Sequence, residues 1–228
     1  MKRNSVLKLF LVTAILLLMA SPALASNWTG TWNTNYGKLV MERDGDWVIG
    51  AYEHNKGKLV GVIKGNTLVG TWSEAPTYNK PDNAGEFEFV ISADGKAFSG
   101  KWRRGSSVDW ISDWKGVRVA GPQKFEDSKV WPQNYVAITS QPLIAPGHQI
   151  TVVFHNAPGN PGDWIAISKV GAPAGDYSFH YEYTEGKKDG TITFAGPVEP
   201  GEYEARLYAE SSDKVIIGRS NVITVANY

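Results

Sequence analysis

In the first half of the chain, large apolar residues alternate with other residues, and a glycine recurs between them on the same face. Residues i, i+2 and i+4 of a strand share one face, so each copy presents a large side chain, a bare position and another large side chain. Glycine inside a strand costs roughly 0.5–1 kcal/mol relative to alanine, so its repetition predicts either a bend or a ring lying over bare backbone. The copies are Trp28/Gly30/Trp32, Val48/Gly50/Tyr52, Leu59/Gly61/Ile63, Leu68/Gly70/Trp72 and Phe98/Gly100/Trp102.

Short turn signals divide this half into strand-length segments. Asp44-Gly45, Gly65-Asn66 and Asp94-Gly95 are typical hairpin turns because Gly, Asn and Asp tolerate positive φ. Consecutive hairpins with repeated glycine bends predict an antiparallel up-and-down meander that curls or closes into a small barrel. The predicted strands are 28–33, 37–43, 47–53, 58–64, 67–73, 85–92, 97–103 and 113–119.

The second half is also strand-rich but is punctuated by proline and glycine. Apolar and polar positions alternate within Ile150–Phe154 and Tyr203–Tyr208, as they do in half-buried antiparallel strands. Six or seven strands in about 95 residues predict an immunoglobulin-like or fibronectin-like β-sandwich. The predicted strands are 136–140, 149–155, 164–169, 177–184, 190–195, 201–208 and 215–225.

The N-terminus and the middle of the chain predict how it is divided into a signal peptide and two domains. Residues 1–25 have a basic start, an apolar run from Leu9 to Ala20 and the small-residue site Ala23-Leu24-Ala25, as a cleaved signal peptide does. We therefore predict an exported protein, periplasmic or extracellular, with an uncleaved anchor as the alternative. Residues 26–120 form the first domain, the polar and proline-broken stretch 121–134 a linker, and 135–228 the second domain.

Composition narrows the function classes. The 23 basic residues include Lys2, Arg3 and Lys8, so removing the signal leaves 20 basic against 23 acidic residues. This balance provides no excess of positive charge for binding nucleic acid or an anionic membrane. No transmembrane segment is predicted after the signal. The absence of cysteine in an exported chain favours a bacterial protein over a small disulfide-stapled eukaryotic one.

Two resemblances add to this picture. The runs "TGTWNTNYGKLVMERDGDWVIGAYEHNKGKLVGVIKGNTLVGTW" and "GEFEFVISADGKAFSGKW" resemble a β-meander module of exported bacterial proteins, and loosely the avidin and lipocalin barrels. The motifs "PGHQITVVFHNAPGNPGDWIAI" and "PGEYEARLY" resemble an immunoglobulin-like sandwich of bacterial surface proteins. The run Asp163–Ile167 is also similar to the core strand of SKICH domains, although Ala166 replaces its glycine. The second resemblance implies a binding or spacer role and a buried core Trp164.

Candidate catalytic groups are few and scattered. The types of a nucleophilic triad occur at His155, Asp163, Ser168 and His180, without a nucleophile elbow around the serine. Asp163 is instead expected to brace the preceding proline-rich loop. Glu42, Glu53, Glu74 and His54 are the carboxylate and imidazole candidates of the first domain. We predict no catalytic set, metal site or cofactor.

The density of aromatic residues in the first domain is the feature that points to a function. Tyr36, Trp47, Tyr78, Trp110 and Trp114 fall outside the inward positions of the repeat, and exposed Trp and Tyr faces stack on sugars or anchor partners. We predict ligand contact at Tyr36, Trp47 and Tyr78, beside the long 74–84 loop. This predicts a non-enzymatic binding protein for a carbohydrate, a small molecule or an envelope protein, with the sandwich as spacer or docking module. A small secreted hydrolase, or an accessory subunit of one, is the alternative.

Overall fold

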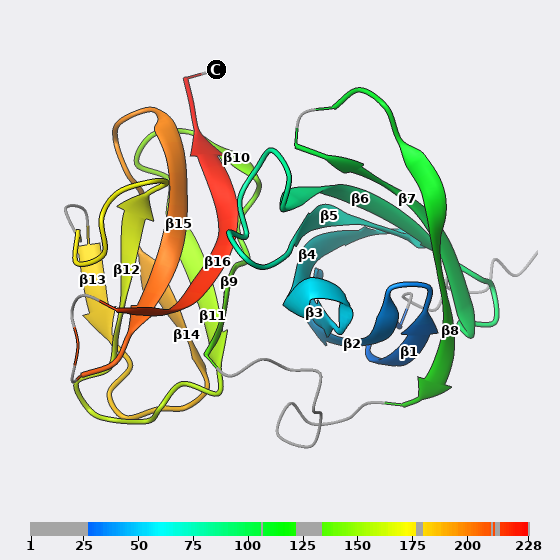
Figure 1. The fold of residues 1–228 in the computed structure, drawn as a ribbon, viewed down its shortest axis with the longest axis horizontal. Coiled ribbons are helices and arrows are strands. Elements are labelled where there is room, and N and C mark those ends of the chain that lie inside the picture. The colour runs from blue at the N-terminus through cyan, green and yellow to red at the C-terminus, as the bar shows by residue number, and fades with distance from the viewer. Residues whose placement is uncertain are drawn as a thin grey trace, which may run out of the picture.

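The computed structural model describes residues 27–105, 107–121, 134–176, 180–210, 212 and 215–227. The predicted signal peptide and residues 122–133 of the predicted linker lie outside them. The fold is all-β, with a barrel from the first half of the chain and a sandwich from the second (Figure 1). Within the described ranges, no helix has the length and apolar character needed to cross a bilayer.

The first half is a closed antiparallel barrel of eight strands. Each strand pairs with the next along the chain, and β1 also pairs with β8, which closes the sheet. The predicted meander is confirmed, and closure selects the barrel over an open curled sheet. The strands are β1 (Gly30–Thr34), β2 (Gly37–Asp44), β3 (Trp47–Tyr52), β4 (Gly57–Lys64), β5 (Thr67–Ser73), β6 (Ala84–Ile91), β7 (Ala97–Arg104) and β8 (Ile111–Ala120); a 3-10 turn, η1 (His54–Lys56), joins β3 to β4.

The repeat residues fill the barrel interior, as the glycine pattern predicts. An added Cβ at Gly100 would lie 2.3 Å from the Phe89 ring, so a ring does cover bare backbone here. Trp114 corrects the sequence interpretation, because it is 2% exposed and belongs to this interior. The interior side chains are Trp28, Trp32, Leu39, Met41, Val48, Tyr52, Leu59, Leu68, Trp72, Phe87, Phe89, Ile91, Phe98 and Trp114.

The second half is a two-sheet sandwich with the immunoglobulin strand arrangement. One sheet has the order β10-β16-β15-β12-β13 and the other the order β14-β11-β9, with β10 parallel to β16. The inner faces of the two sheets share one apolar core. The strands are β9 (Tyr135–Ile138), β10 (Leu143–Ile144), β11 (Ile150–His155), β12 (Trp164–Lys169), β13 (His180–Tyr183), β14 (Gly190–Phe194), β15 (Gly201–Tyr208) and β16 (Ile216–Val225).

Tyr203 and Trp164 show where the sandwich places two of its buried aromatic side chains. Near the start of β15, the Tyr203 hydroxyl donates to the Glu199 carbonyl at 3.0 Å, which is the tyrosine corner of immunoglobulin-like folds. Trp164 is buried, but not in the core between the sheets. It stacks on Tyr208 at 4.1 Å on the outer face of the five-stranded sheet, because its neighbours Ile165 and Ile167 take the inward positions of β12.

The barrel and the sandwich meet through an apolar interface. Outward residues of β2, β3 and β4 pack against the outer face of the three-stranded sheet, so this sheet is covered on both sides. The buried interface cluster comprises Val40, Ile49, Ala51, Val60, Tyr135, Ala137 and Val153, with Trp47 packed against it. Lys58 adds a polar contact, because its Nζ donates to the Arg219 carbonyl at 2.8 Å. The second half therefore contacts the barrel directly rather than only through the chain.

This interface predicts that the halves stay associated after the chain is cut between them. With a protease site inserted within residues 122–133, the two cleaved halves should co-elute in size-exclusion chromatography. Val153→Glu should separate them, because it buries an unpaired charge in the cluster. Thr151→Glu, two positions away on the same strand face and outside the cluster, is the matched control. Separation of the unsubstituted halves would contradict a stable interface.

Candidate functional site

A groove runs along the outer wall of the barrel where it faces the sandwich. It has a volume of about 310 Å³. The barrel contributes residues of β4, β5, β6 and β7 together with Trp47 and Trp110, and the sandwich contributes Ser140, Gln141, Pro142 and Asn221. The groove thus contains residues from both halves of the chain.

Strand alternation determines which residues face this groove. Since Leu68, Gly70 and Trp72 point into the barrel, Val69 and Thr71 must point outward. The register places Thr71 opposite Glu86 and Glu86 opposite Arg103, so these three polar residues lie in one row across the wall. Val60 and Val62, outward on β4, give the groove an apolar side.

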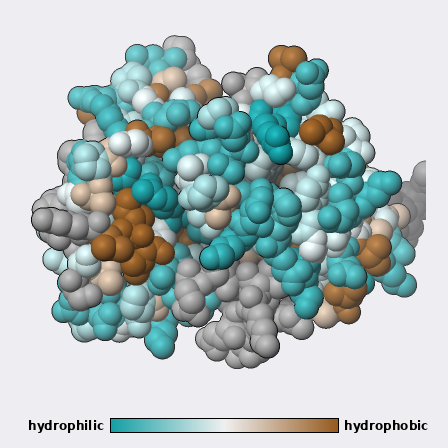
Figure 2. Space-filling model, viewed as in Figure 1, coloured by the Kyte–Doolittle hydropathy of each residue, from teal (hydrophilic) through white to brown (hydrophobic). Residues whose placement is uncertain are grey.

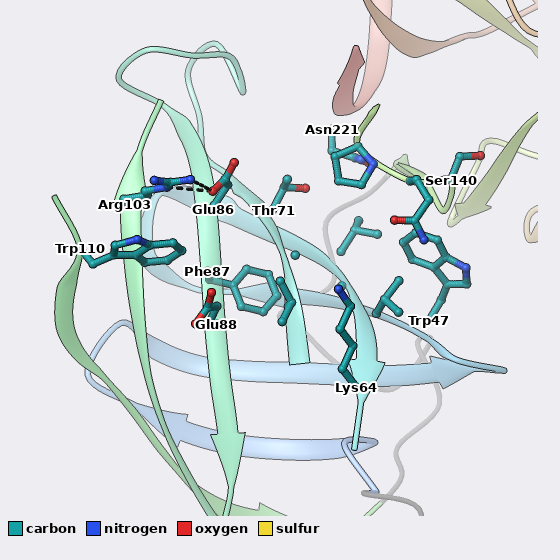
Figure 3. Close-up of a pocket in the computed structure, with 17 residues that line it drawn as sticks. Trp47, Lys64, Thr71, Glu86, Phe87, Glu88, Arg103, Trp110, Ser140 and Asn221 are labelled. Atoms are coloured by element: carbon teal, nitrogen blue, oxygen red, sulfur yellow. Dashed lines mark hydrogen bonds and ion pairs between the residues drawn. The ribbon is translucent and has the colours of Figure 1, made fainter. Parts of the chain in front are cut away.

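Two ion pairs and a tryptophan form one end of the groove. Arg103 pairs with Glu86, as Figure 3 shows. Beside this pair, Lys101 pairs with Glu88 at 2.8 Å. The cations of Lys101 and Arg103 lie 4.5 and 4.6 Å from the Trp110 ring centroid. Both project from β7 two positions apart, so they approach the indole from the same side. These contacts hold a partly exposed indole in one orientation over the barrel wall.

Trp47 lies on the opposite side of the groove, next to the sandwich (Figure 3). It begins β3 and points outward, because the next residue, Val48, belongs to the barrel interior. Its half-buried indole packs against the interface cluster, which fixes its position. Asn221, on the sandwich side, exchanges two hydrogen bonds with the backbone of Ile138, at 2.8 and 3.1 Å. The groove walls are therefore held by packing and hydrogen bonds.

The structure does not bring the three predicted site residues together. Tyr36 and Tyr78 lie in the β1–β2 and β5–β6 connections, at the barrel end that also carries η1. Trp47 follows the β2–β3 turn at the other end of the strands. The Tyr36 ring packs on Trp114 at 4.7 Å, and its hydroxyl donates to Asp113 at 3.2 Å. Only Trp47 borders the groove.

The barrel end near Tyr36 carries a hydrogen-bonded polar cluster. Glu74 accepts bonds from the Tyr52 hydroxyl at 2.9 Å and the Asn55 amide at 3.0 Å. Burial, and secondly the charge of Glu74, raises the pKa of Tyr52 well above its usual value, so this phenol stays protonated and donates. The Tyr78 hydroxyl donates to the Lys56 carbonyl at 3.3 Å. This cluster ties the long loop to the barrel end.

Three of the four residues with triad chemistry, Asp163, Ser168 and His155, have separate partners. Asp163 accepts bonds from the backbone of Asn160 at 2.8 Å and of Glu210 at 2.9 Å, which confirms that it braces the preceding loop. The Ser168 hydroxyl donates to the Asp176 carbonyl at 2.8 Å. His155 lies 3.1 Å from Asp189, and burial lowers its pKa while Asp189 opposes that change. No metal-binding group of three or more His, Cys, Asp or Glu occurs among the described residues.

Sequence reasoning did not identify Glu86, Arg103 or the sandwich wall. The two ion pairs can be recognised in the sequence. Glu86 and Glu88 lie two positions apart on one predicted strand, and Lys101 and Arg103 lie two positions apart on the next. An antiparallel hairpin places such residues opposite one another on its outer face. The contribution of Ser140 and Gln141 has no local signal, because it depends on how the two halves dock.

Comparisons with known proteins add little to this geometry. No protein-family model matches the chain, and no curated protein matches it significantly. Among solved structures, the chain is similar to one titled human OSCAR ligand-binding domain, at 13% identity, covering 82% of this chain and 96% of that one, with a TM-score of 0.26. A match at this TM-score supports no inference about the fold or the ligand.

The face drawn in Figure 2 is mostly hydrophilic, with hydrophobic residues in separate patches. Exposed apolar side chains such as Val117, Val119 and Val215 are distributed over the barrel and the sandwich. Scattered apolar residues are ordinary on a protein surface, whereas a permanent interface needs a continuous apolar patch.

Proposed function

We propose that this is an exported, non-enzymatic binding protein whose ligand is a carbohydrate held in the groove between the barrel wall and the sandwich. The observation that carries the proposal is a groove of about 310 Å³ bounded by two partly exposed tryptophans and an ion-paired row of polar groups. A sugar presents apolar C–H faces that stack on indole rings and hydroxyls that bond to carboxylate, guanidinium and amide groups. Both kinds of surface line this groove.

The sandwich acts in this proposal as one wall of the site rather than as a spacer. Ser140, Gln141 and Pro142 stand opposite the barrel residues, so a ligand in the groove touches both halves. Ligand contact at Tyr36 and Tyr78 stays a separate prediction, as does an envelope protein as partner. The hydrolase alternative needs clustered titratable groups free to transfer protons. The groove carboxylates Glu86 and Glu88 face cations instead, which favours binding.

The proposal predicts that removing one indole weakens binding without unfolding the protein. The mature protein, residues 26–228, is screened on a glycan array, and hits are titrated by calorimetry. Trp110→Ala should weaken binding about tenfold, since about 1.4 kcal/mol of lost stacking and burial is one decade in affinity. Tyr183→Ala is the control, because Tyr183 is an exposed aromatic on β13, which the groove does not include.

Two results would contradict the proposal. One is the absence of binding to any glycan by a folded protein, as judged by circular dichroism. The other is glycan binding that is equal in the wild type and in Trp110→Ala. If Tyr36→Ala abolished binding while Trp110→Ala did not, the ligand site would lie at the barrel end near Tyr36.

A further inference from the structure

A second groove of about 200 Å³ lies along the same junction, on the other side of Trp47. The barrel side is formed by Glu42, Arg43 and Asp44 of β2 and by Ile49 of β3. The sandwich side includes Thr139, Val153, His155 and Thr191. The function proposed above does not use this groove.

Trp47 connects the two grooves. It lines both of them, and its strand β3 lies between β2, which borders the second groove, and β4, which borders the first. On the facing wall the consecutive residues Thr139 and Ser140 border the second and the first groove respectively. The two grooves are therefore neighbours on both walls, with the edge of one indole between them.

The volumes bear on the size of the ligand. Binding sites for small molecules usually occupy about 300–1,000 Å³. The first groove, at about 310 Å³, is at the bottom of this range, and the second, at about 200 Å³, is below it. Taken together they fall inside the range as one elongated site, which suits a ligand longer than a single sugar.

The charges of the second groove select among such ligands. Burial raises the pKa of Glu42, and the neighbouring charges of Asp44 and Asp189 raise it further. A carboxyl in this setting takes up a proton more readily. It can then donate a hydrogen bond to a sugar hydroxyl as well as accept one from it. The groove lining carries the carboxyls of Glu42 and Asp44 against the guanidinium of Arg43, so a neutral sugar fits this end better than a uronic acid.

We propose that the two grooves form one continuous binding site, and that it takes an extended chain of neutral sugars crossing the edge of Trp47. This inference rests on the proposed carbohydrate function and adds the form and charge of the ligand. Because packing against the interface cluster fixes Trp47, the site is already arranged for the chain before binding.

The test is the dependence of affinity on chain length. Cello-, xylo-, manno- and chito-oligosaccharides of two and six units are titrated into the mature protein, with oligogalacturonate of six units as the anionic probe. In the series that binds, the hexamer should bind about tenfold more tightly than the dimer, as added contacts require. The anionic hexamer should bind more weakly than the neutral one.

A variant that blocks the second groove tests whether the higher affinity of the hexamer arises there. Thr191→Phe places a ring in that groove at an exposed position, so the hexamer should fall to the affinity of the dimer while dimer binding persists. Thr193→Phe, the same substitution two positions along the same face of β14, should leave both affinities unchanged. Retained dimer binding shows that the blocked variant is folded.

The outcomes separate the two proposals. Equal affinity for dimer and hexamer in the wild type, or a hexamer gain that survives Thr191→Phe, would overturn the extended site and leave the first groove as the binding site. Tighter binding of the anionic hexamer would overturn the neutral-chain assignment. Failure of every oligosaccharide to bind would overturn the carbohydrate function itself.

Discussion

Gly70→Val is expected to lower the free energy of unfolding by about 3 kcal/mol, the upper part of the usual cost of overpacking. Gly70 lies opposite Gly61 in the β4–β5 pair inside the barrel. A Cβ added there would lie 2.0 Å from the Val60 carbonyl oxygen and 2.5 Å from the Gly61 Cα. At Gly70 the obstacle is thus neighbouring backbone rather than a ring, and backbone cannot move aside as a side chain can.

The measurement is urea unfolding followed by tryptophan fluorescence, which reports on the barrel interior. Gly121→Val is the matched control, because an added Cβ at Gly121 meets nothing within 4 Å. The control midpoint should stay close to that of the wild type. An unchanged midpoint for Gly70→Val would contradict the close approach of β4 and β5, and with it the closed barrel.

Lys58→Met is expected to stabilise the protein at neutral and acidic pH. Lys58 is only 6% exposed, and burial lowers its pKa from 10.5 to about 7. Below pH 7 a shift of this size corresponds to about 5 kcal/mol, at about 1.36 kcal/mol per unit. The bond to the Arg219 carbonyl and the rings of Tyr78 and Tyr135, 4.9 and 5.2 Å away, favour the charged form and offset part of the cost. We therefore expect a gain of about 2–4 kcal/mol.

The gain should depend on pH in a defined direction. Between about pH 7 and 10.5 the unfolded chain holds a proton on Lys58 that the native state lacks, so wild-type stability rises with pH through this window. Below about pH 7 both states are protonated, and the destabilisation is present in full. The advantage of Lys58→Met should thus be largest below pH 7 and shrink toward pH 10.

Denaturant midpoints measured from pH 6 to pH 10 test this dependence. Lys64→Met is the control, because Lys64 is an exposed residue on the same outward face of β4, and its substitution should give no such pH-dependent gain. If Lys58→Met instead destabilised the protein at every pH, the carbonyl bond and the two tyrosine rings would outweigh the cost of desolvating the charge. Lys58 would then be a stabilising contact between barrel and sandwich.

The sequence predicts only part of the candidate site. It indicates Trp47 and Trp110 as aromatics outside the inward repeat, and both border the groove. The same pattern places Trp114 with them, yet Trp114 lies inside the barrel. The strand pattern predicted for 113–119 does not reveal which alternate set faces inward, because tryptophan suits either face. Pairing of β8 with both β7 and β1 decides this.

Local periodicity determined most of the fold. Alternation of apolar and polar residues, divided by Gly, Pro, Asn and Asp turns, is a property of neighbouring residues. The sequence alone therefore predicts nearly all the strands and the order of a barrel followed by a sandwich. It also predicted the filled interior of the barrel through the glycine pattern. Only the tertiary structure decided that the barrel closes, that Trp164 faces outward, and that β2–β4 dock on the three-stranded sheet. The grooves on either side of Trp47 follow from this docking, because their walls come from both halves of the chain. No local pattern encodes such a contact, since it depends on the complementarity of two surfaces that exist only once each half has folded.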